Sequence, residues 1–176
     1  MIRLFNRKPK ELAEKEIYSL FAEKMLLLCF RYLSNLMDAE EAMHNGFLKV
    51  FDNLKNFEER YEHGFENWIK KIMVNESLMF LRKRANFKLL CIDSIKEKEM
   101  NEFEFCDNLE PEAYLKIINE LPVGYRTVFN LYAIEGYAHN EIADMLGIAE
   151  STSRSQLTKA RKILQQKITK SESLYA

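Results

Sequence analysis

The stretch GYAHNEIADMLGIAESTSRSQLTKARKIL, from Gly136 to Leu164, predicts two short helices joined at a glycine. Apolar residues recur between Glu141 and Leu146 at a spacing that gives the first helix one apolar face. Gly147 follows as a residue that takes the left-handed turn conformation without a Cβ clash. The second helix begins near Ser151 with small polar residues and then becomes basic. The pattern is therefore that of a helix-turn-helix.

The second helix of this stretch has the side chains that a helix in the DNA major groove needs. Short side chains let its backbone approach the duplex, Arg and Gln carry paired donors for base edges, and Lys and Arg meet phosphates. The alternative is a surface hairpin of helices with a solvated basic face; the turn glycine and the polar start of the second helix favour DNA binding. We predict duplex contacts from Ser151, Thr152, Arg154, Ser155, Thr158, Lys159 and Arg161.

Composition limits the fold and the class of function. With 176 residues, 47% hydrophobic and 30% charged, the chain can form one large domain or two small ones. Only 5 Gly and 3 Pro indicate an almost wholly helical, all-α protein. We expect no membrane span and no signal peptide, because no apolar run reaches about 18 residues and the start, MIRLFNRKPKELAEKE, lacks the apolar segment of such a peptide. Cys29, Cys91 and Cys106 form no disulfide framework or metal-binding spacing, so we expect a cytoplasmic protein without metal or cofactor.

The net charge of −1 hides a segregation of charge along the chain. Residues 67–88 carry six basic side chains against Glu76 alone, and residues 148–170 carry six against Glu150 alone. Residues 86–110 contain seven carboxylates. Two basic blocks separated by an acidic stretch suggest two nucleic-acid-facing modules on a linker. We therefore predict a domain over 1–85, an acidic linker over 86–110 and a second domain over 111–176.

Periodicity and helix-breaking residues predict the helices outside the helix-turn-helix. The first runs from Ile17 to Leu33, where Ser34 and Asn35 end it. In the second, Asp38 is predicted to be the N-cap with Glu41 at the third helical position, and the helix continues to Leu54. The others are predicted over Phe65–Arg84, Glu112–Leu121 and Arg126–Glu135.

The predicted second helix has two different faces. Ala39, Ala42, Met43, Gly46, Phe47, Val50, Phe51 and Leu54 form its core face. The opposite side carries Glu41, Asn45, Leu48 and Asp52. An exposed leucine among polar residues indicates a partner, although isolated surface leucines are also common.

The predicted third helix combines aromatic rings with cations. Phe57, Tyr61, Phe65 and Trp68 cluster around a loop, while Lys71, Asn75, Leu78 and Arg82 recur on one predicted face. Rings beside a basic groove are suited to holding unstacked single-stranded bases, whereas the alternative is that rings such as Trp68 belong to the core. His44, His63 and His139 are predicted to be ordinary surface or boundary residues.

The whole chain resembles a bacterial sigma factor of the small, two-domain extracytoplasmic-function (ECF) type. The first part of the resemblance consists of LCFRYL (Leu28–Leu33), DAEEA (Asp38–Ala42) and FLKVFDNL (Phe47–Leu54), followed by FENWIKKIMVN (Phe65–Asn75) and LRKR (Leu81–Arg84). The second part is ELPVGYRTVFNLYAIEGYAHNEIADMLGI followed by STSRSQLTKARKIL. Their order and separation are more specific than any one motif.

The resemblance implies a region 2-like helical bundle, a region 4-like helix-turn-helix domain and a non-enzymatic role in transcription initiation. It implies that Glu41, Asn45, Leu48 and Asp52 dock on the β′ subunit of RNA polymerase core. It also implies that promoter DNA is bound in two places. The −10 element, with a flipped base, is taken by Tyr61, Trp68, Lys71, Asn75 and Arg82, whereas the −35 element is read by the helix from Ser151. An anti-sigma factor is a further candidate partner.

Some residues depart from the family pattern. Asn45 stands where an acidic residue is frequent, and Gly46 follows it in mid-helix, where glycine costs about 0.5–1 kcal/mol relative to alanine. Ala138 and Ala149 occupy predicted helix caps that are usually serine-like. Ser153 replaces a usual apolar residue and Gln156 a usual arginine. These departures affect the expected promoter sequence.

Two other classes of function fit parts of the sequence. One is a helix-turn-helix repressor or activator that works without being a polymerase subunit. Such a protein would bind duplex DNA tightly as a dimer in the absence of polymerase. The other is a helical interaction module that binds regulators and never DNA, for which the basic helix from Arg154 to Arg161 would have no use.

Overall fold

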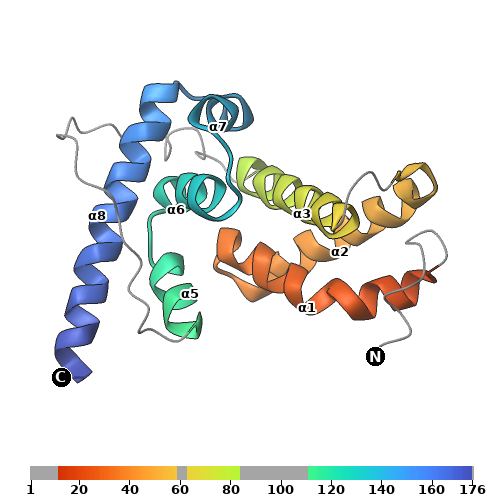
Figure 1. Cartoon of the computed structure of the whole chain (residues 1–176), viewed down its shortest axis with the longest axis horizontal. Coiled ribbons are helices and arrows are strands. Elements are labelled where there is room, and N and C mark those ends of the chain that lie inside the picture. Colours follow the sequence, from red (N-terminus) through yellow and green to blue (C-terminus); the bar gives the residue numbers. More distant parts are fainter. Residues whose placement is uncertain (1–11, 59–62, 84–110, 176) are drawn as a thin grey trace. The chain divides into compact units, whose positions relative to one another are not determined.

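A computed structural model describes residues 12–58, 63–83 and 111–175 of the chain (Figure 1). Its elements in this part of the chain are helical, as predicted: α1 (Glu14–Leu33), α2 (Leu36–Asn53), the 3-10 turn η2 (Leu54–Asn56), α3 (Gly64–Lys83), α5 (Pro111–Asn119), α6 (Val123–Phe129), the π-turn η3 (Asn130–Ile134), α7 (His139–Leu146) and α8 (Glu150–Tyr175). The chain divides into two compact units between Leu81 and Arg82.

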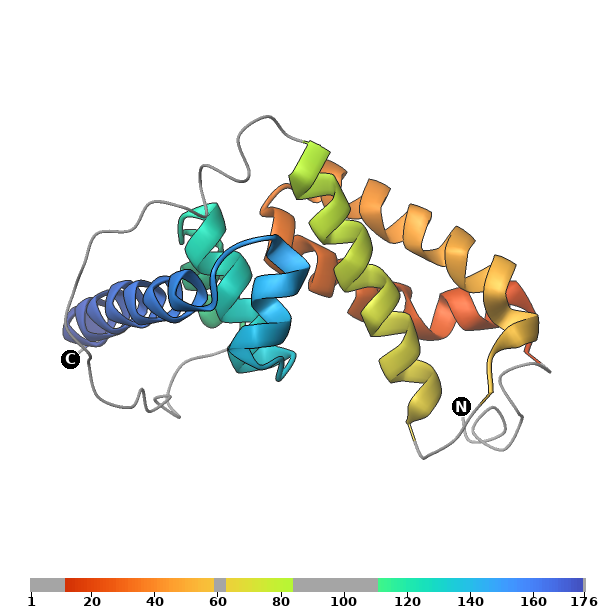
Figure 2. The ribbon, with the colours of Figure 1, turned by 90° about the horizontal axis from the view of Figure 1, so that it is seen from above.

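The first unit is built from α1, α2 and α3, which Figure 2 shows side by side. Each helix buries one stripe, and residues of all three make the core: Ile17, Met25, Leu28, Tyr32, Ala39, Met43, Phe47, Val50, Phe65, Ile69 and Met73. The predicted core face of α2 is buried from Ala39 to Val50, whereas Phe51 and Leu54 are only half-buried at its end. Burial of these apolar stripes is what holds the three helices together.

The start of α2 differs from the sequence prediction. Asn35, not Asp38, is the N-cap, and its side-chain oxygen accepts a hydrogen bond from the backbone N–H of Asp38 at 3.1 Å. Asp38 is therefore the third helical residue. Its carboxylate still lies in the first turn, where its negative charge interacts favourably with the positive end of the helix dipole. Asparagine and aspartate cap equally well, so the sequence alone does not choose between them.

Gly46 lies where α2 passes close to α3. A Cβ atom built on Gly46 would lie 2.4 Å from the sulfur of Met73 and 2.9 Å from its terminal methyl carbon. Met73 is fully buried, so its side chain has little free space in which to move. The helix-weakening glycine is therefore explained by close helix packing.

We expect Gly46→Ala to lower the free energy of unfolding by about 1–3 kcal/mol, because overpacking a core outweighs the gain in helix propensity. Urea denaturation measures the change, and Glu40→Ala, an exposed site on α2, is the control. In a Met73→Ala background the same substitution should become stabilising, since the thioether is gone. An equal cost in both backgrounds would show that steric contact with Met73 is not the reason for the glycine.

The second unit places α5, α6 and α7 against the long helix α8. Its core contains Ile117, Leu121, Val128, Phe129, Leu131, Ile142, Leu146, Leu157, Ala160 and Leu164. The helix before the helix-turn-helix begins at Val123, with Pro122 as N-cap, earlier than the predicted Arg126. Pro122 has a ψ of 144°, which lies outside the helical range, so the first helical residue is Val123. The helix continues through the π-turn η3 and ends before Gly136, whose φ is +80°.

Arg126 ties α5 to α6. Its guanidinium donates hydrogen bonds to the carbonyl oxygens of Asn119 and Leu121, at 2.9 and 3.2 Å. Burial lowers the pKa of Arg126 to about 10, which leaves the side chain charged at neutral pH. The positive charge therefore neutralises carbonyl groups at the C-terminal end of α5.

Several sequence predictions lie outside the described residues. They are the linker over 86–110, Cys91, Cys106 and Tyr61. Cys29 is described: it is buried in the first unit, and burial raises the pKa of its thiol to about 11. Since the thiolate is the reactive form, this thiol is chemically quiet at neutral pH.

Candidate nucleic-acid interface

The predicted helix-turn-helix is present in the second unit. α7 buries Ile142, Ala143 and Leu146, and Gly147 ends it in the left-handed conformation with φ +66°. The alanine cap is supported by a neighbour, because the Glu141 carboxylate accepts a hydrogen bond from the Ala138 backbone N–H at 2.8 Å. α8 then begins at Glu150, one residue before the predicted start.

The outward side of α8 carries most of the residues predicted to contact duplex DNA. Ser151 and Arg154 are exposed, and Thr152, Ser155, Thr158 and Arg161 are half-buried. Arg154 forms an i,i+4 ion pair with Glu150. Its side chain is 65% exposed, so the ion pair is worth only about 0.3–0.5 kcal/mol. The Arg154 guanidinium can therefore exchange the Glu150 carboxylate for a base edge.

Two residues considered for DNA contacts on this helix are instead buried. Lys159 is only 9% exposed, and its Nζ lies 5.8 Å from the ring centroid of Tyr125. A helix turns about 100° per residue, so Lys159 lies about 140° round α8 from Arg154. Gln156, considered a base-reading side chain, is 1% exposed. The predicted exposure of Lys159 was therefore wrong.

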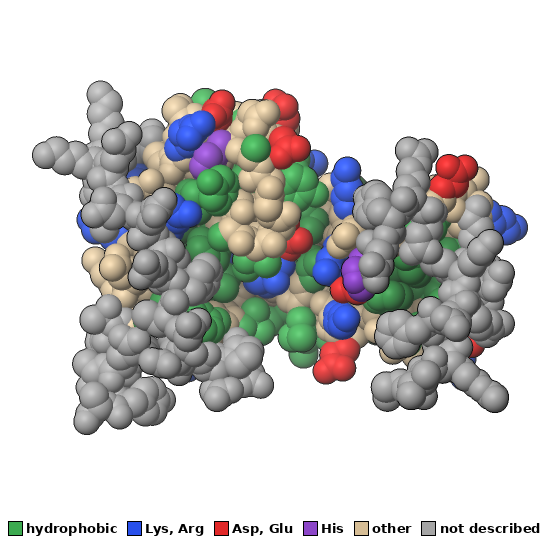
Figure 3. All heavy atoms as spheres, in the orientation of Figure 1, with side chains coloured by type: hydrophobic (Ala, Val, Ile, Leu, Met, Phe, Trp, Pro, Cys, Tyr) green, Lys and Arg blue, Asp and Glu red, His purple; other side chains and the backbone are tan. Residues whose placement is uncertain are grey.

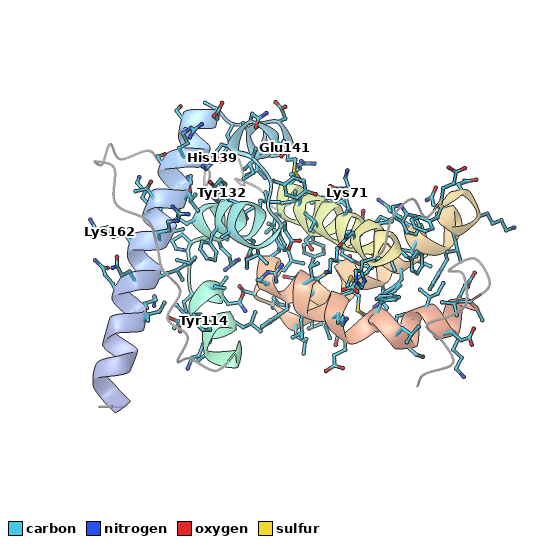
Figure 4. All side chains as sticks on the ribbon, in the orientation of Figure 1. Lys71, Tyr114, Tyr132, His139, Glu141 and Lys162 are labelled. Atoms are coloured by element: carbon cyan, nitrogen blue, oxygen red, sulfur yellow. The ribbon has the colours of Figure 1, made fainter. Side chains whose placement is uncertain are left out.

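A group of stacked and hydrogen-bonded side chains that the sequence analysis missed links η3 to α7 and α8. His139, predicted to be a surface or boundary residue, is buried, and its Nδ1 lies 2.8 Å from the Ser153 hydroxyl oxygen. Its ring stacks on Tyr132 with centroids 4.5 Å apart. Figure 4 labels both residues near α8. The guanidinium carbon of Arg161 lies 5.8 Å from the centre of the Tyr132 ring. Figure 3 shows basic and histidine side chains next to one another over the beginning of α8.

The protonation state of His139 follows from this environment. Burial, together with the positive charge of Arg154, holds the pKa of His139 below its ordinary value. The ring is therefore neutral at pH 7 and forms a dipolar rather than an ionic contact with Ser153. The polar Ser153 at a usually apolar position is thus satisfied by His139, a pairing that was readable only with the fold known.

The helix α3 carries the residues of the predicted cationic face. Lys71, Asn75 and Arg82 are exposed. Leu78, predicted on the same face, is instead buried at 1% exposure, and Met79 is exposed in its place. The spacing from Lys71 to Asn75 to Met79 is four residues at each step, which stays on one side of a helix.

Trp68 lies half-buried in an aromatic cluster at the beginning of α3. Its ring centroid is 4.9 Å from that of Phe57 and 5.8 Å from that of Phe65. Phe65 also meets Phe21 of α1 in an edge-to-face contact at 5.8 Å. Trp68 therefore joins the core on one side and is accessible on the other.

The predicted partner-binding stripe of α2 is exposed along its whole length. Glu41, Asn45, Leu48 and Asp52 all face solvent, and Leu48 is 62% exposed. Beside the stripe, Lys49 donates to the Glu76 carboxylate of α3 at 2.5 Å. The stripe thus belongs to a helix whose opposite face is fixed by the core and whose flank is tied to α3.

Comparison with known families matches both units. The model of sigma-70 region 2 matches residues 17–87, and the model of sigma-70 region 4 matches residues 112–164. Together the two matches span most of the chain. The chain belongs to the sigma-70 family.

Curated relatives place this sigma factor in the ECF group. It is 27% identical over 164 residues to the ECF RNA polymerase sigma factor SigE of Mycolicibacterium smegmatis, covering 90% of this chain and 62% of that protein. It is 24% identical to the ECF sigma-E factor of Haemophilus influenzae, covering 86% and 85% of the two chains. With SigW of Bacillus subtilis the identity is 24% and the coverage 87% of each. The chain thus spans less than two thirds of the first relative and most of the other two.

A solved structure shows the same fold. It is the sigma factor RpoE of Bartonella quintana, crystallised with the anti-sigma factor NepR, with a TM-score of 0.53 and 21% identity. The match covers 88% of this chain and 96% of that one.

Sigma factors are transcription initiation factors that direct RNA polymerase to specific promoters, and the comparisons do not favour a regulator that acts without polymerase. No helix that the structure describes in this sigma factor has both the length and the apolarity of a membrane span.

Proposed function

We propose that this sigma factor uses its three exposed helix faces for three successive tasks in initiation. The α2 stripe of Glu41, Asn45, Leu48 and Asp52 binds the β′ subunit of polymerase core. The α3 face of Lys71, Asn75 and Arg82, with Tyr61 and Trp68, holds the −10 element. The outward side of α8 reads the −35 element. Residues 1–85 and 111–176 are the two functional domains, and 86–110 is the linker between them.

The observation that carries the proposal is the division of each of these helices into a packed face and a free one. On α2 Ala39, Ala42 and Phe47 are buried, while Leu48 is exposed among polar side chains. On α3, buried and exposed side chains likewise lie on different sides of the helix between Phe65 and Leu81. Leucines and cations that make no contribution to the core are available for partners.

Binding to polymerase core, the first of these tasks, distinguishes a sigma factor from a regulator that binds DNA independently. The free protein should bind a promoter duplex weakly, whereas the complex with polymerase core should bind it tightly. Fluorescence anisotropy with a labelled promoter fragment, with and without core enzyme, measures both. Tight binding by a dimer of the free protein would instead support the repressor or activator alternative.

The same proposal gives the chain its other partners and its location. A sigma factor that works with core polymerase acts in the cytoplasm and catalyses no reaction itself. The Bartonella quintana relative was crystallised with an anti-sigma factor. We extend that class of partner to this chain as a part of the proposal.

For the −35 element, Arg154 is the base-reading residue. Its guanidinium is exposed and can donate two hydrogen bonds to a guanine edge, a contact worth about 1–3 kcal/mol of discrimination. Arg154→Ala should therefore relax the preference at one or two −35 positions. Arg161→Ala should weaken binding to all sequences alike, because phosphates carry no sequence information.

The measurement is transcription from a library with a randomised −35 element by each variant holoenzyme. Gln166→Ala, also exposed on α8 but outside the predicted DNA contacts, is the matched control for a side-chain truncation. Identical sequence profiles for the unmodified protein and Arg154→Ala would exclude this residue from base reading.

A further inference from the structure

The cations along α8 are held in different ways, and this difference points to one of them as an anchor for the DNA backbone. Lys159 lies over the Tyr125 ring but is buried, and Arg154 is paired with the Glu150 carboxylate. Arg161 also lies over a ring, that of Tyr132, with its guanidinium carbon 5.8 Å from the ring centroid, but it is only half-buried. Arg161 follows Arg154 by seven residues, about two helical turns, so both lie on the same side of α8.

A ring contact holds an arginine without using its donors. The aromatic face attracts the flat face of the guanidinium, so the N–H groups in the guanidinium plane remain available for a phosphate. A carboxylate partner would occupy those donors and cancel the charge. Holding the side chain in place also reduces the conformational entropy that an arginine loses on binding.

Tyr132 is itself held in place. It belongs to the π-turn η3, a π-helical segment of a rare type that follows α6 directly. Its ring stacks on His139 at 4.5 Å and 21°, and His139 is fixed by the contact between its Nδ1 and the Ser153 hydroxyl of α8. Because the His139 ring is neutral at pH 7, it adds no second cation beside Arg161. Figure 4 shows Tyr132 and His139 together beside α8.

We propose that Tyr132 is a positioning residue that holds Arg161 for a backbone phosphate of the bound duplex, with His139 and Ser153 fixing Tyr132. This inference rests on the proposed reading of the −35 element by α8. It assigns a DNA-binding role to a residue outside the recognition helix that does not itself read a base. The anchor acts on every sequence, since it recognises phosphate.

The experiment uses the holoenzyme and a promoter fragment selected from the transcribed library, with binding measured over a range of salt concentrations. Each lost phosphate contact lowers the slope of log affinity against log salt by about one. Tyr132→Leu and Arg161→Ala should each lower the slope by about one and weaken binding by about threefold to tenfold. Tyr132→Phe keeps the ring and should behave as the unmodified protein. Ile134→Ala, an equally exposed site in the same turn, is the control and should change neither quantity.

The double variant separates positioning from a general structural effect. If Tyr132 acts through Arg161, then Tyr132→Leu should cause no further loss in an Arg161→Ala background. Additive losses, or an unchanged salt slope for Tyr132→Leu, would overturn the inference. If Arg161→Ala lowers the slope and Tyr132→Leu does not, the positioning role fails while the −35 proposal stands. A holoenzyme that binds no promoter at all would instead defeat the proposed function.

Discussion

A Leu48→Arg variant is expected to bind RNA polymerase core about tenfold more weakly, or worse, while it remains helical and folded. Leu48 is 62% exposed, so its replacement removes little from the core of the first unit. In a complex, the same position would force a guanidinium into an apolar contact, where an unpaired charge loses its hydration. A tenfold loss corresponds to about 1.4 kcal/mol, which is modest for such a burial.

A titration of labelled protein with core enzyme measures the affinity, and circular dichroism with thermal unfolding checks the fold. Leu27→Arg is the matched control, because Leu27 is 51% exposed but lies on α1, away from the stripe. It should bind core normally. Equal affinities for Leu48→Arg and the unmodified protein would refute the assignment of the α2 stripe.

Asn75→Ala is expected to leave core binding intact and to reduce open-complex formation about fivefold. Asn75 is exposed on α3 one turn after Lys71, so its side chain contributes nothing to the core. Loss of a hydrogen bond from an amide to unpaired DNA costs about 1 kcal/mol, which is about fivefold in the equilibrium between closed and open complexes.

Permanganate reactivity of unpaired thymines measures strand separation directly. Asn53→Ala, which truncates an exposed asparagine on α2, should open promoters as the unmodified protein does. If Asn75→Ala also opens promoters normally, the DNA-binding face of α3 has been chosen wrongly.

The parts of this fold that could be predicted from sequence are those that depend on local rules. Gly147 could be predicted as the turn residue because a glycine directly after an apolar helical stripe is a local signal for a helix end. The structure gives it the left-handed conformation. The buried and exposed faces of α2 followed from a spacing that keeps Leu48 on the opposite side of the helix from Ala39 and Val50. Both features needed only helix geometry.

The errors arose where a small rotation or a distant partner decides the outcome. Leu78 and Lys159 lie at the edges of their predicted faces, where a shift of one residue moves a side chain into the core. The pairing of His139 with Ser153 joins two helices across the turn. Met73 against Gly46 joins two helices that are well separated in sequence. Contacts of this kind are set by tertiary packing, which periodicity does not encode.

The most direct test of the account is transcription in vitro with purified core polymerase, followed by mapping of the transcript starts. We expect the protein to confer initiation at a defined set of start sites, each preceded by related −10 and −35 sequences, and core enzyme alone to use none of them. The unmodified protein should do so on fully duplex templates. Failure to direct any specific start, in a preparation shown to be folded and mixed with active core, would contradict the central claim.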